Sequence, residues 1–145
     1  MSDLEASITD IELRVRYAET DQMRLAHHAN YLVWCEQART EHMRRLGVSY
    51  RELEQAGIHL PVVEATLRYR RGARYDDALR VRCWVREASS RRVVFGYAIE
   101  RVVDGTLLAT ARTSLIAVDA DQRVRALPAS VRQCLVPVQD PVRLM

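Results

Sequence analysis

Hydrophobic and polar residues follow two different periods along this chain. From Ile11 to Tyr17 every second residue is apolar, which predicts a strand with one buried face. From Asn30 to Leu46 apolar residues recur every three or four positions, which predicts an amphipathic helix. Asn30 is the expected N-cap of that helix, and Gly47 is expected to end it.

A short second helix and a series of strands are expected after Gly47. Ser49 starts a capping-box pattern, and Gly57 is expected to end the helix that follows it. Beyond Gly57 the period is two, and Ser89-Ser90 and Asp104-Gly105 indicate turns between antiparallel strands. The expected strands cover residues 58–70, 79–86, 93–99 and 107–118, and a last extended segment covers residues 123–127.

One long helix beside an antiparallel sheet with a face to cover predicts the α+β class. The chain has 145 residues, of which 48% are hydrophobic, so one domain with one core is expected. That domain is assigned to residues 1–145, with its core at about 10–135. The residues after Leu135 include Pro137 and Pro141 and are expected to form an extended tail.

Composition argues against several classes of protein. No apolar run reaches the roughly 18 residues of a membrane-spanning helix. Met1–Glu5 is acidic and lacks the apolar segment of a signal peptide, so a cytoplasmic location is expected. The three cysteines do not have the spacing of a zinc site or of a disulfide framework. A net charge of +3 does not indicate a nucleic-acid partner.

All 22 basic residues are arginines, and codon usage explains this bias without any function. Two local clusters at turns are more specific. A guanidinium group donates several hydrogen bonds in one plane, so such clusters suit phosphate groups. The alternative is that these arginines are solvated at strand ends. The clusters are Arg68, Arg70, Arg71 and Arg74, and Arg91 with Arg92.

Polar side chains gather in the connection from Tyr17 to Tyr31, between the first strand and the long helix. A loop held by rigid elements is a frequent place for a functional site. Asp21 is the main candidate, as a general base toward water or a nucleophile toward an acyl carbon. The alternative is that Asp21 only caps a turn. His28 can orient water or donate to an acyl group, or it can bond the backbone.

The start of the long helix adds a second feature. The main-chain N–H groups from Ala29 to Tyr31 are expected to be free, and such groups polarise a carbonyl or hold an oxyanion. Tyr31 and Trp34 can line an apolar acyl pocket, and core positions explain them equally well. His27 is expected to point elsewhere, and no metal site is expected because no ligand cluster is visible.

The connection and the helix carry the pattern Tyr17-x-Glu19-Thr20-Asp21, followed by His28-x-Asn30-Tyr31-x-x-Trp34-x-Glu36-x-Ala38-Arg39. This pattern resembles the signature of hot-dog-fold acyl-CoA thioesterases, in the branch of 4-hydroxybenzoyl-CoA thioesterase and the Tol–Pal-associated acyl-CoA thioesterases. The match is dense from Val15 to Leu46. The resemblance implies one long central helix wrapped by a curled antiparallel sheet.

The resemblance also implies a function, the hydrolysis of acyl-CoA to a free acid and CoA without a metal ion or other cofactor. It implies that Asp21 is the catalytic carboxylate, that His28 and Tyr17 assist it, and that the helix start at Asn30 and Tyr31 polarises the thioester carbonyl. It further implies a homodimer joined edge to edge, often paired into a homotetramer, with sites at the interface and CoA phosphates held by arginines. The substrate-binding candidates are Asn30, Tyr31, Trp34, Arg70, Arg71 and Arg91.

The chain departs from the resemblance at Arg24, where many relatives have glycine. Glycine permits a positive φ, so arginine implies either an ordinary φ or a strained turn. Two other functions stay open. One is hydration or dehydration of an acyl thioester, although the histidine and acid motif of such enzymes is not clear on this helix. The other is a non-catalytic module that binds acyl-CoA, which Arg24 and the looser loop favour.

Overall fold

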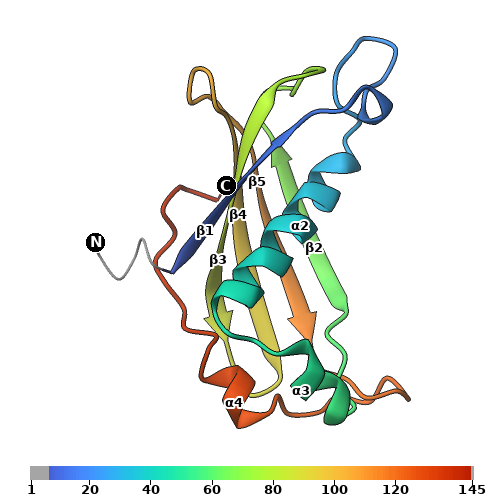
Figure 1. Ribbon diagram of the computed structural model, residues 1–145, viewed down its shortest axis with the longest axis vertical. Helices are drawn as coiled ribbons and strands as arrows, with labels where there is room; N and C mark the ends of the chain where they lie inside the picture. Colours follow the sequence, from blue (N-terminus) through green and yellow to red (C-terminus); the bar gives the residue numbers. More distant parts are fainter. Residues whose placement is uncertain (1–6, 145) are drawn as a thin grey trace.

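The computed structural model describes residues 7–144, and the segment Met1–Glu5 lies outside them (Figure 1). A strand and a long helix come first, and a meander of antiparallel strands follows, which confirms the predicted α+β class. The elements are β1 (Ile8–Arg14), the 3₁₀ turn η1 (Tyr17–Glu19), α2 (Asn30–Arg45), α3 (Tyr50–Gln55), β2 (Val62–Tyr69), β3 (Ala78–Ala88), β4 (Arg92–Arg101), β5 (Leu107–Ile116) and α4 (Ala129–Arg132).

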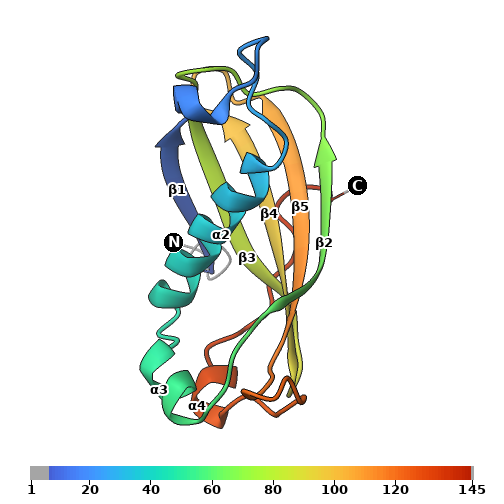
Figure 2. The same ribbon diagram turned by 90° about the vertical axis from the view of Figure 1, so that its right-hand side faces the viewer.

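The strands form one antiparallel sheet in the order β1-β3-β4-β5-β2. The sheet curls, and α2 lies along its concave face (Figure 2). This is the arrangement that the resemblance to hot-dog proteins implies. Because β2 is the last strand in the order, one of its sides has no neighbour among the described residues, and every residue of β2 except Leu67 is exposed.

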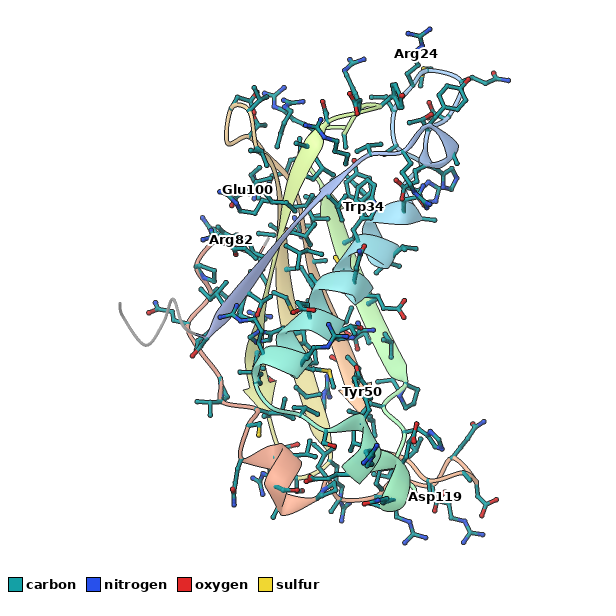
Figure 3. All side chains as sticks on the ribbon, in the orientation of Figure 1. Arg24, Trp34, Tyr50, Arg82, Glu100 and Asp119 are labelled. Carbon is teal, nitrogen blue, oxygen red and sulfur yellow. The ribbon has the colours of Figure 1, made fainter. Side chains whose placement is uncertain are left out.

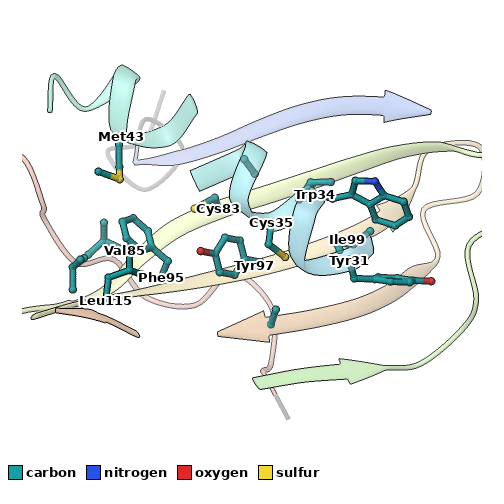
Figure 4. Close-up of a cluster of buried hydrophobic side chains, with 14 of the residues drawn as sticks. Tyr31, Trp34, Cys35, Met43, Cys83, Val85, Phe95, Tyr97, Ile99 and Leu115 are labelled. Atoms are coloured by element: carbon teal, nitrogen blue, oxygen red, sulfur yellow. The ribbon is translucent and has the colours of Figure 1, made fainter. Parts of the chain in front are cut away.

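The core lies between α2 and the sheet (Figure 4). The buried apolar positions of α2 face the strands, because three- and four-residue steps return to the same side of a helix, whereas Leu32 and Val33 are exposed. Trp34 on α2 and Phe95 and Tyr97 on β4 are at most 2% exposed. Each large side chain buried in this way contributes roughly 1.5–3 kcal/mol to folding. This packing fixes the direction of α2 and therefore the position of its first turn.

The helix ends follow the sequence signals except at the start of α2. Gly47 follows the end of α2 with a φ of 85°, and the Ser49 side chain accepts the Glu52 N–H at the start of α3, as predicted. The prediction that Asn30 is the N-cap is wrong, because Ala29 occupies that position. Asn30 is the first helical residue, and its side chain joins α2 to the preceding loop.

The first strand begins and ends earlier than predicted, and Tyr17 belongs to η1 rather than to β1. The Arg16 N–H donates to Glu19 Oε1 (2.8 Å), and this local bond turns the chain out of the sheet. The last segment, residues 123–127, forms no named strand. It joins the sheet through the isolated bridge between Val124 and Val118 and through the N–H groups of Arg125 and Leu127, which donate to the carbonyls of Ala117 (2.9 Å) and Ser90 (2.7 Å).

The tail packs on the outer face of the sheet, opposite α2. Trp84 alternates with arginines on β3, a spacing that would place it on the polar side of the strand, yet it is fully buried. Asp140 of the tail accepts the Trp84 indole N–H (2.8 Å) and two N–H groups of Arg86 (2.9 Å each). The tail residues that cover this face with apolar side chains are Val138, Val142 and Leu144.

Candidate active site

Glu19 fastens the loop after β1 to helix α2. Its Oε1 accepts the Arg16 N–H, and its Oε2 accepts the Trp34 indole N–H (2.9 Å). Its carbonyl accepts the His27 N–H (2.8 Å) and the Asn30 side-chain amide (2.9 Å). Burial raises the pKa of the Glu19 carboxyl, but the bonds from Arg16 and Trp34 and the Arg16 charge outweigh burial, so this pKa lies below its ordinary value. Glu19 is therefore ionised and holds both ends of the loop.

Asp21 shapes a tight turn at the tip of the loop. Its Oδ1 accepts the N–H groups of Met23 (2.8 Å) and Leu25 (3.2 Å). Its own N–H donates to the Leu25 carbonyl (2.8 Å). The second carboxylate oxygen, Oδ2, has no hydrogen-bond partner among residues 7–144. Asp21 thus caps a turn with one oxygen and keeps the other available to a ligand.

Arg24 closes the same turn in the left-handed region, with a φ of 62°. This settles the alternative left by the sequence in favour of strain, since side chains other than glycine pay roughly 1–2 kcal/mol there. Figure 3 shows the Arg24 side chain extending from the tip of the loop. The turn that holds Asp21 therefore contains a residue, Arg24, for which the φ of the turn is unfavourable.

A pocket of about 320 Å³ opens between the loop, the start of α2 and the end of β2. It brings together several residues that the sequence selected and that lie far apart in the chain. The sequence-predicted residues in its lining are Asp21, His28, Tyr31, Arg70 and Arg71, and the others are Leu25, Ala26, Tyr69 and Gly72.

The main chain of His28 offers a hydrogen-bond donor in this pocket. The His27 carbonyl accepts the Asn30 N–H (3.0 Å). In a trans peptide the N–H points opposite to the C=O, so the His28 N–H points away from the helix. No acceptor for that N–H lies among residues 7–144. Tyr69 holds the residue from the other side, because its hydroxyl donates to the His28 carbonyl (3.1 Å).

The N–H groups expected to be free at the helix start are occupied. The N–H of Ala29 donates to His27 Nδ1 (3.3 Å), and that of Tyr31 donates to the His28 carbonyl (3.3 Å). The loop folds back in tight turns and uses these donors, so the available donor lies earlier, at His28. His27, which was expected to point elsewhere, is not among the residues that line the pocket, and its ring stacks on that of His28 with centroids 4.2 Å apart.

Four predicted site residues are not part of the pocket lining, and one of them is Asn30, whose side-chain amide donates to the Glu19 carbonyl. Tyr17 is 73% exposed, and its ring packs edge-on against Tyr75 (5.8 Å). Trp34 is a core residue, as one of its two interpretations held. Arg91 lies at the β3–β4 turn, at the opposite end of the sheet from the loop (Figure 1). Sequence reasoning missed Tyr69, whose strand position gave no sign that its hydroxyl meets the loop.

Neither a metal site nor a membrane-spanning helix is found among residues 7–144. No group of three or more His, Cys, Asp or Glu side chains there is arranged to hold a metal ion. None of the helices in this part of the chain is long and apolar enough to cross a membrane. Asp119 forms a turn, and its Oδ1 accepts the N–H groups of Asp121 (2.9 Å) and Arg123 (3.0 Å).

Comparison with known proteins finds one family over most of the chain. The sequence profile of the thioesterase-like superfamily matches residues 15–137. YneP of Bacillus subtilis is 39% identical over 110 residues, covering 76% of this chain and 79% of YneP. The acyl-CoA thioester hydrolase YbgC of Escherichia coli O157:H7 is 32% identical over 120 residues, covering 82% and 89%. The DHNA-CoA thioesterase of Staphylococcus aureus superposes with a TM-score of 0.77 at 35% identity, covering 83% and 80%.

Proposed function

The chain belongs to the thioesterase-like superfamily, and we propose that it hydrolyses the thioester bond of acyl-CoA with Asp21 as the catalytic carboxylate. The enzyme is a thioester hydrolase, which consumes one water and releases a carboxylic acid and CoA. The observation that carries the proposal is the pocket beside Asp21. There a carboxylate oxygen without a partner among residues 7–144 lies with the His28 main chain and two arginines.

The carbonyl of the thioester is polarised by the His28 N–H. As the carbonyl carbon is attacked, negative charge develops on its oxygen, and a preorganised donor stabilises that charge. This N–H is held in place by the bonds of Asn30 and Tyr69 to the neighbouring carbonyls. Removing a donor of this type from other enzymes costs roughly 10²–10³ in rate.

Asp21 brings about attack on the carbonyl carbon in one of two ways. As a general base, its carboxylate takes a proton from water, and the water oxygen bonds to the carbonyl carbon. As a nucleophile, Oδ2 bonds to that carbon and forms a mixed anhydride, which water then hydrolyses. In both routes the carbon–sulfur bond breaks, and CoA leaves as a thiolate that takes up a proton.

Two further residues support the reaction in the proposal. His28 belongs to the pocket lining, and we assign its imidazole the role of orienting the attacking water. Tyr17 acts through its main chain, since its carbonyl accepts the N–H (3.0 Å) and the hydroxyl (2.7 Å) of Thr20. These bonds fix the residue directly before Asp21.

CoA is held by its phosphates at the mouth of the pocket. Arg70 and Arg71 line that mouth and suit phosphate oxygens. Arg91 lies too far away within one chain, so its contact requires a second subunit. No metal ion or cofactor is part of this mechanism, because CoA enters as part of the substrate.

The working unit that we propose is a homodimer joined along β2, from which a homotetramer can form by pairing. The exposed open side of β2 presents unpaired N–H and C=O groups, which in other proteins recruit a further strand. A cytoplasmic location stays part of the proposal. It is supported by Cys35, Cys83 and Cys134, which are all free thiols.

The test is thiol release from short, long and aromatic acyl-CoAs by the wild type, Asp21→Asn and the control Asp121→Asn. Asparagine keeps a side-chain oxygen for the Met23 and Leu25 N–H groups, so the turn is retained. We expect Asp21→Asn to lose about 10²–10⁴ in rate and Asp121→Asn to lose nothing. Near-wild-type release by Asp21→Asn would refute the role of Asp21.

The same assay separates the two alternatives. A hydratase acting on crotonyl-CoA leaves the thioester intact, so substrate changes while no thiol appears. A binding module retains acyl-CoA and releases no thiol from any substrate. Either result, obtained with folded protein, would overturn the proposed hydrolysis.

A further inference from the structure

We propose that two chains pair antiparallel along β2 with Thr66 on the two-fold axis, so that Glu64 of each chain faces Arg68 of the other. The proposed function includes a dimer joined along β2 but does not say which residues face each other across the two strands. The present inference adds that register and rests on the proposed function. The register decides which residues of the partner subunit lie beside the Asp21 pocket. It follows from the backbone direction and the charge pattern of one strand.

The backbone groups on the open side of β2 belong to alternate residues. The Arg70 N–H donates to the Leu108 carbonyl (2.8 Å), so the even-numbered residues of β2 bond to β5 in their antiparallel register. The N–H and C=O groups of Ala65 and Leu67 therefore point to the open side. In a two-fold antiparallel pair, a residue whose N–H and C=O groups point to the open side must face another such residue of the partner subunit. Because these are the odd-numbered residues, the axis passes through a residue and not between two.

The charges on β2 choose among the possible axes. Arg68 has no acceptor among residues 7–144, whereas Glu64 accepts only Arg112 Nη2 (3.2 Å) from its own chain. With Thr66 on the axis, each Arg68 faces Glu64 of the partner subunit. These positions are non-hydrogen-bonded pairs, in which facing Cα atoms lie about 4.5 Å apart and opposite charges attract.

Neighbouring axes leave Arg68 without a carboxylate opposite. With the axis through Ala65, the residue opposite Arg68 is Val62 of the partner subunit. With the axis through Leu67, it is Thr66 of the partner subunit. The Thr66 axis therefore gives the unpaired Arg68 guanidinium of each chain a carboxylate partner. It also joins Arg112, Glu64 and the partner's Arg68 into one network. The pattern Glu64-x-Thr66-x-Arg68 is self-complementary about its centre.

This register completes the pocket with a second surface. Tyr69 lines the Asp21 pocket at one end of β2, and Val63 lines an apolar groove of about 870 Å³ at the other end. Within one chain the two ends are separated by the length of the strand. Across the seam, Tyr69 lies beside Val63 of the partner subunit, so the groove of one chain continues the pocket of the other.

The groove identifies the substrate class as thioesters with an extended apolar acyl chain. Such a chain has no polar groups and gains most from apolar walls. The apolar residues of the groove are Leu60, Pro61, Val63, Ile116, Val118 and Val124. Hydrolysis should therefore favour long aliphatic acyl-CoA over acetyl-CoA, and replacement of Val63 should reduce that preference.

The register is tested by disulfide formation between single cysteines on β2, in a background in which Cys134 is serine. Thr66→Cys should form a covalent dimer on oxidation, because a facing Cα distance of about 4.5 Å permits a disulfide. Arg68→Cys should not, because two such residues lie about 14 Å apart along the strands. A covalent dimer from Ala65→Cys or Leu67→Cys, and not from Thr66→Cys, would overturn the proposed register.

The ion pair is tested by charge reversal and analytical ultracentrifugation. Arg68→Glu places two carboxylates opposite each other and should raise the dimer dissociation constant at least about tenfold. Glu64→Arg in the same chain restores opposite charges and should recover most of the affinity. Arg51→Glu on α3 is the matched control and should have no effect. No recovery in the double variant would contradict the pairing of Glu64 with Arg68.

The shared site is tested by mixing two impaired variants, Asp21→Asn and Val63→Glu. If each site uses Asp21 of one chain and Val63 of the other, a mixed dimer has one intact site. Random mixing then recovers about a quarter of wild-type activity on a long-chain acyl-CoA. No recovery with proven mixed dimers would refute the shared site. The disulfide test needs no activity, so failure of hydrolysis and failure of the register give different results.

Discussion

The Trp34 indole N–H and the Glu19 carboxylate form a buried hydrogen bond of 2.9 Å that joins α2 to the loop carrying Asp21. Glu19 is only 5% exposed, and it also accepts the Arg16 N–H. A charged acceptor held by two donors fixes the loop more firmly than a neutral one does. The residue beside the catalytic candidate is thus a structural support for it.

Replacing Glu19 by glutamine should loosen this support. Glutamine has one oxygen, so either the Arg16 N–H or the Trp34 indole loses its acceptor. We expect the free energy of unfolding to fall by about 1–3 kcal/mol, and thiol release to fall with it. Urea denaturation and the thiol assay measure the two effects. Unchanged stability in Glu19→Gln would show that these hydrogen bonds do not support the loop.

Arg24→Gly should stabilise the protein. Glycine adopts a φ of 62° without strain, and the gain is about 1 kcal/mol. Asp76 has a φ of 66° and lies outside the linings of both the pocket and the groove, so Asp76→Gly is a matched control for stability. We expect both variants to gain stability and only Arg24→Gly to change KM. A loss of stability in Arg24→Gly would refute the strain at this turn.

His42 should make stability depend on pH. It is buried, its Nδ1 lies 2.6 Å from Thr9 Oγ1, and its Nε2 has no partner among residues 7–144. Burial, together with the Arg45 charge, lowers its pKa from 6.5 to about 4. The unfolded chain therefore binds a proton at a higher pH than the folded chain does, and stability falls as the pH falls through that window.

The expected loss from His42 is about 3 kcal/mol between pH 6.5 and pH 4. His42→Leu removes the titrating group and the unpaired nitrogen. Other groups titrate in both proteins, so the measurement is the difference between the two curves of unfolding free energy against pH. The variant should become more stable relative to wild type as the pH falls. Parallel curves would exclude this role of His42.

Gly96→Ala should damage the outer face of the sheet. A Cβ on Gly96 would lie 2.6 Å from the Trp84 ring, whose indole N–H is bound by the Asp140 carboxylate. The ring cannot give way, so the variant should lose about 1–3 kcal/mol. Gly57→Ala is not a fair control, because Gly57 has a positive φ. Ala98→Gly, beside it on β4, reports the cost of a change without a clash. Equal thermal stability of Gly96→Ala and wild type would show that Trp84 is free to move.

The features that were predicted correctly from the sequence are those that the local spacing of residues determines. The periods of three to four and of two identified α2 and the strands, and Gly47 and Gly57 marked the helix ends correctly. Three residues singled out in the motif loop, Asp21, His28 and Tyr31, share one pocket, and their roles there stay a prediction. Arg70 and Arg71 join them because the end of β2 returns to the loop, which neither the spacing nor the resemblance indicated.

Tertiary contacts account for what the sequence could not predict. The available donor is the His28 N–H rather than those of Ala29 to Tyr31, because the loop turns consume the latter. Trp84 has the spacing of a residue on the polar face of β3, and only the packing of the tail explains why it is buried. Tyr69 has an ordinary strand position, and only the curl of the sheet brings its hydroxyl to His28.

The tail changes where this protein can be cut. The match to the family ends at residue 137, and a truncated version designed from that match would stop there. It would lose Asp140 and with it the partner of Arg86 and of the Trp84 indole. The result would be an uncovered tryptophan on an open sheet, an aggregation hazard created by the choice of end point. Seven residues outside the shared family sequence thus belong to the folded unit.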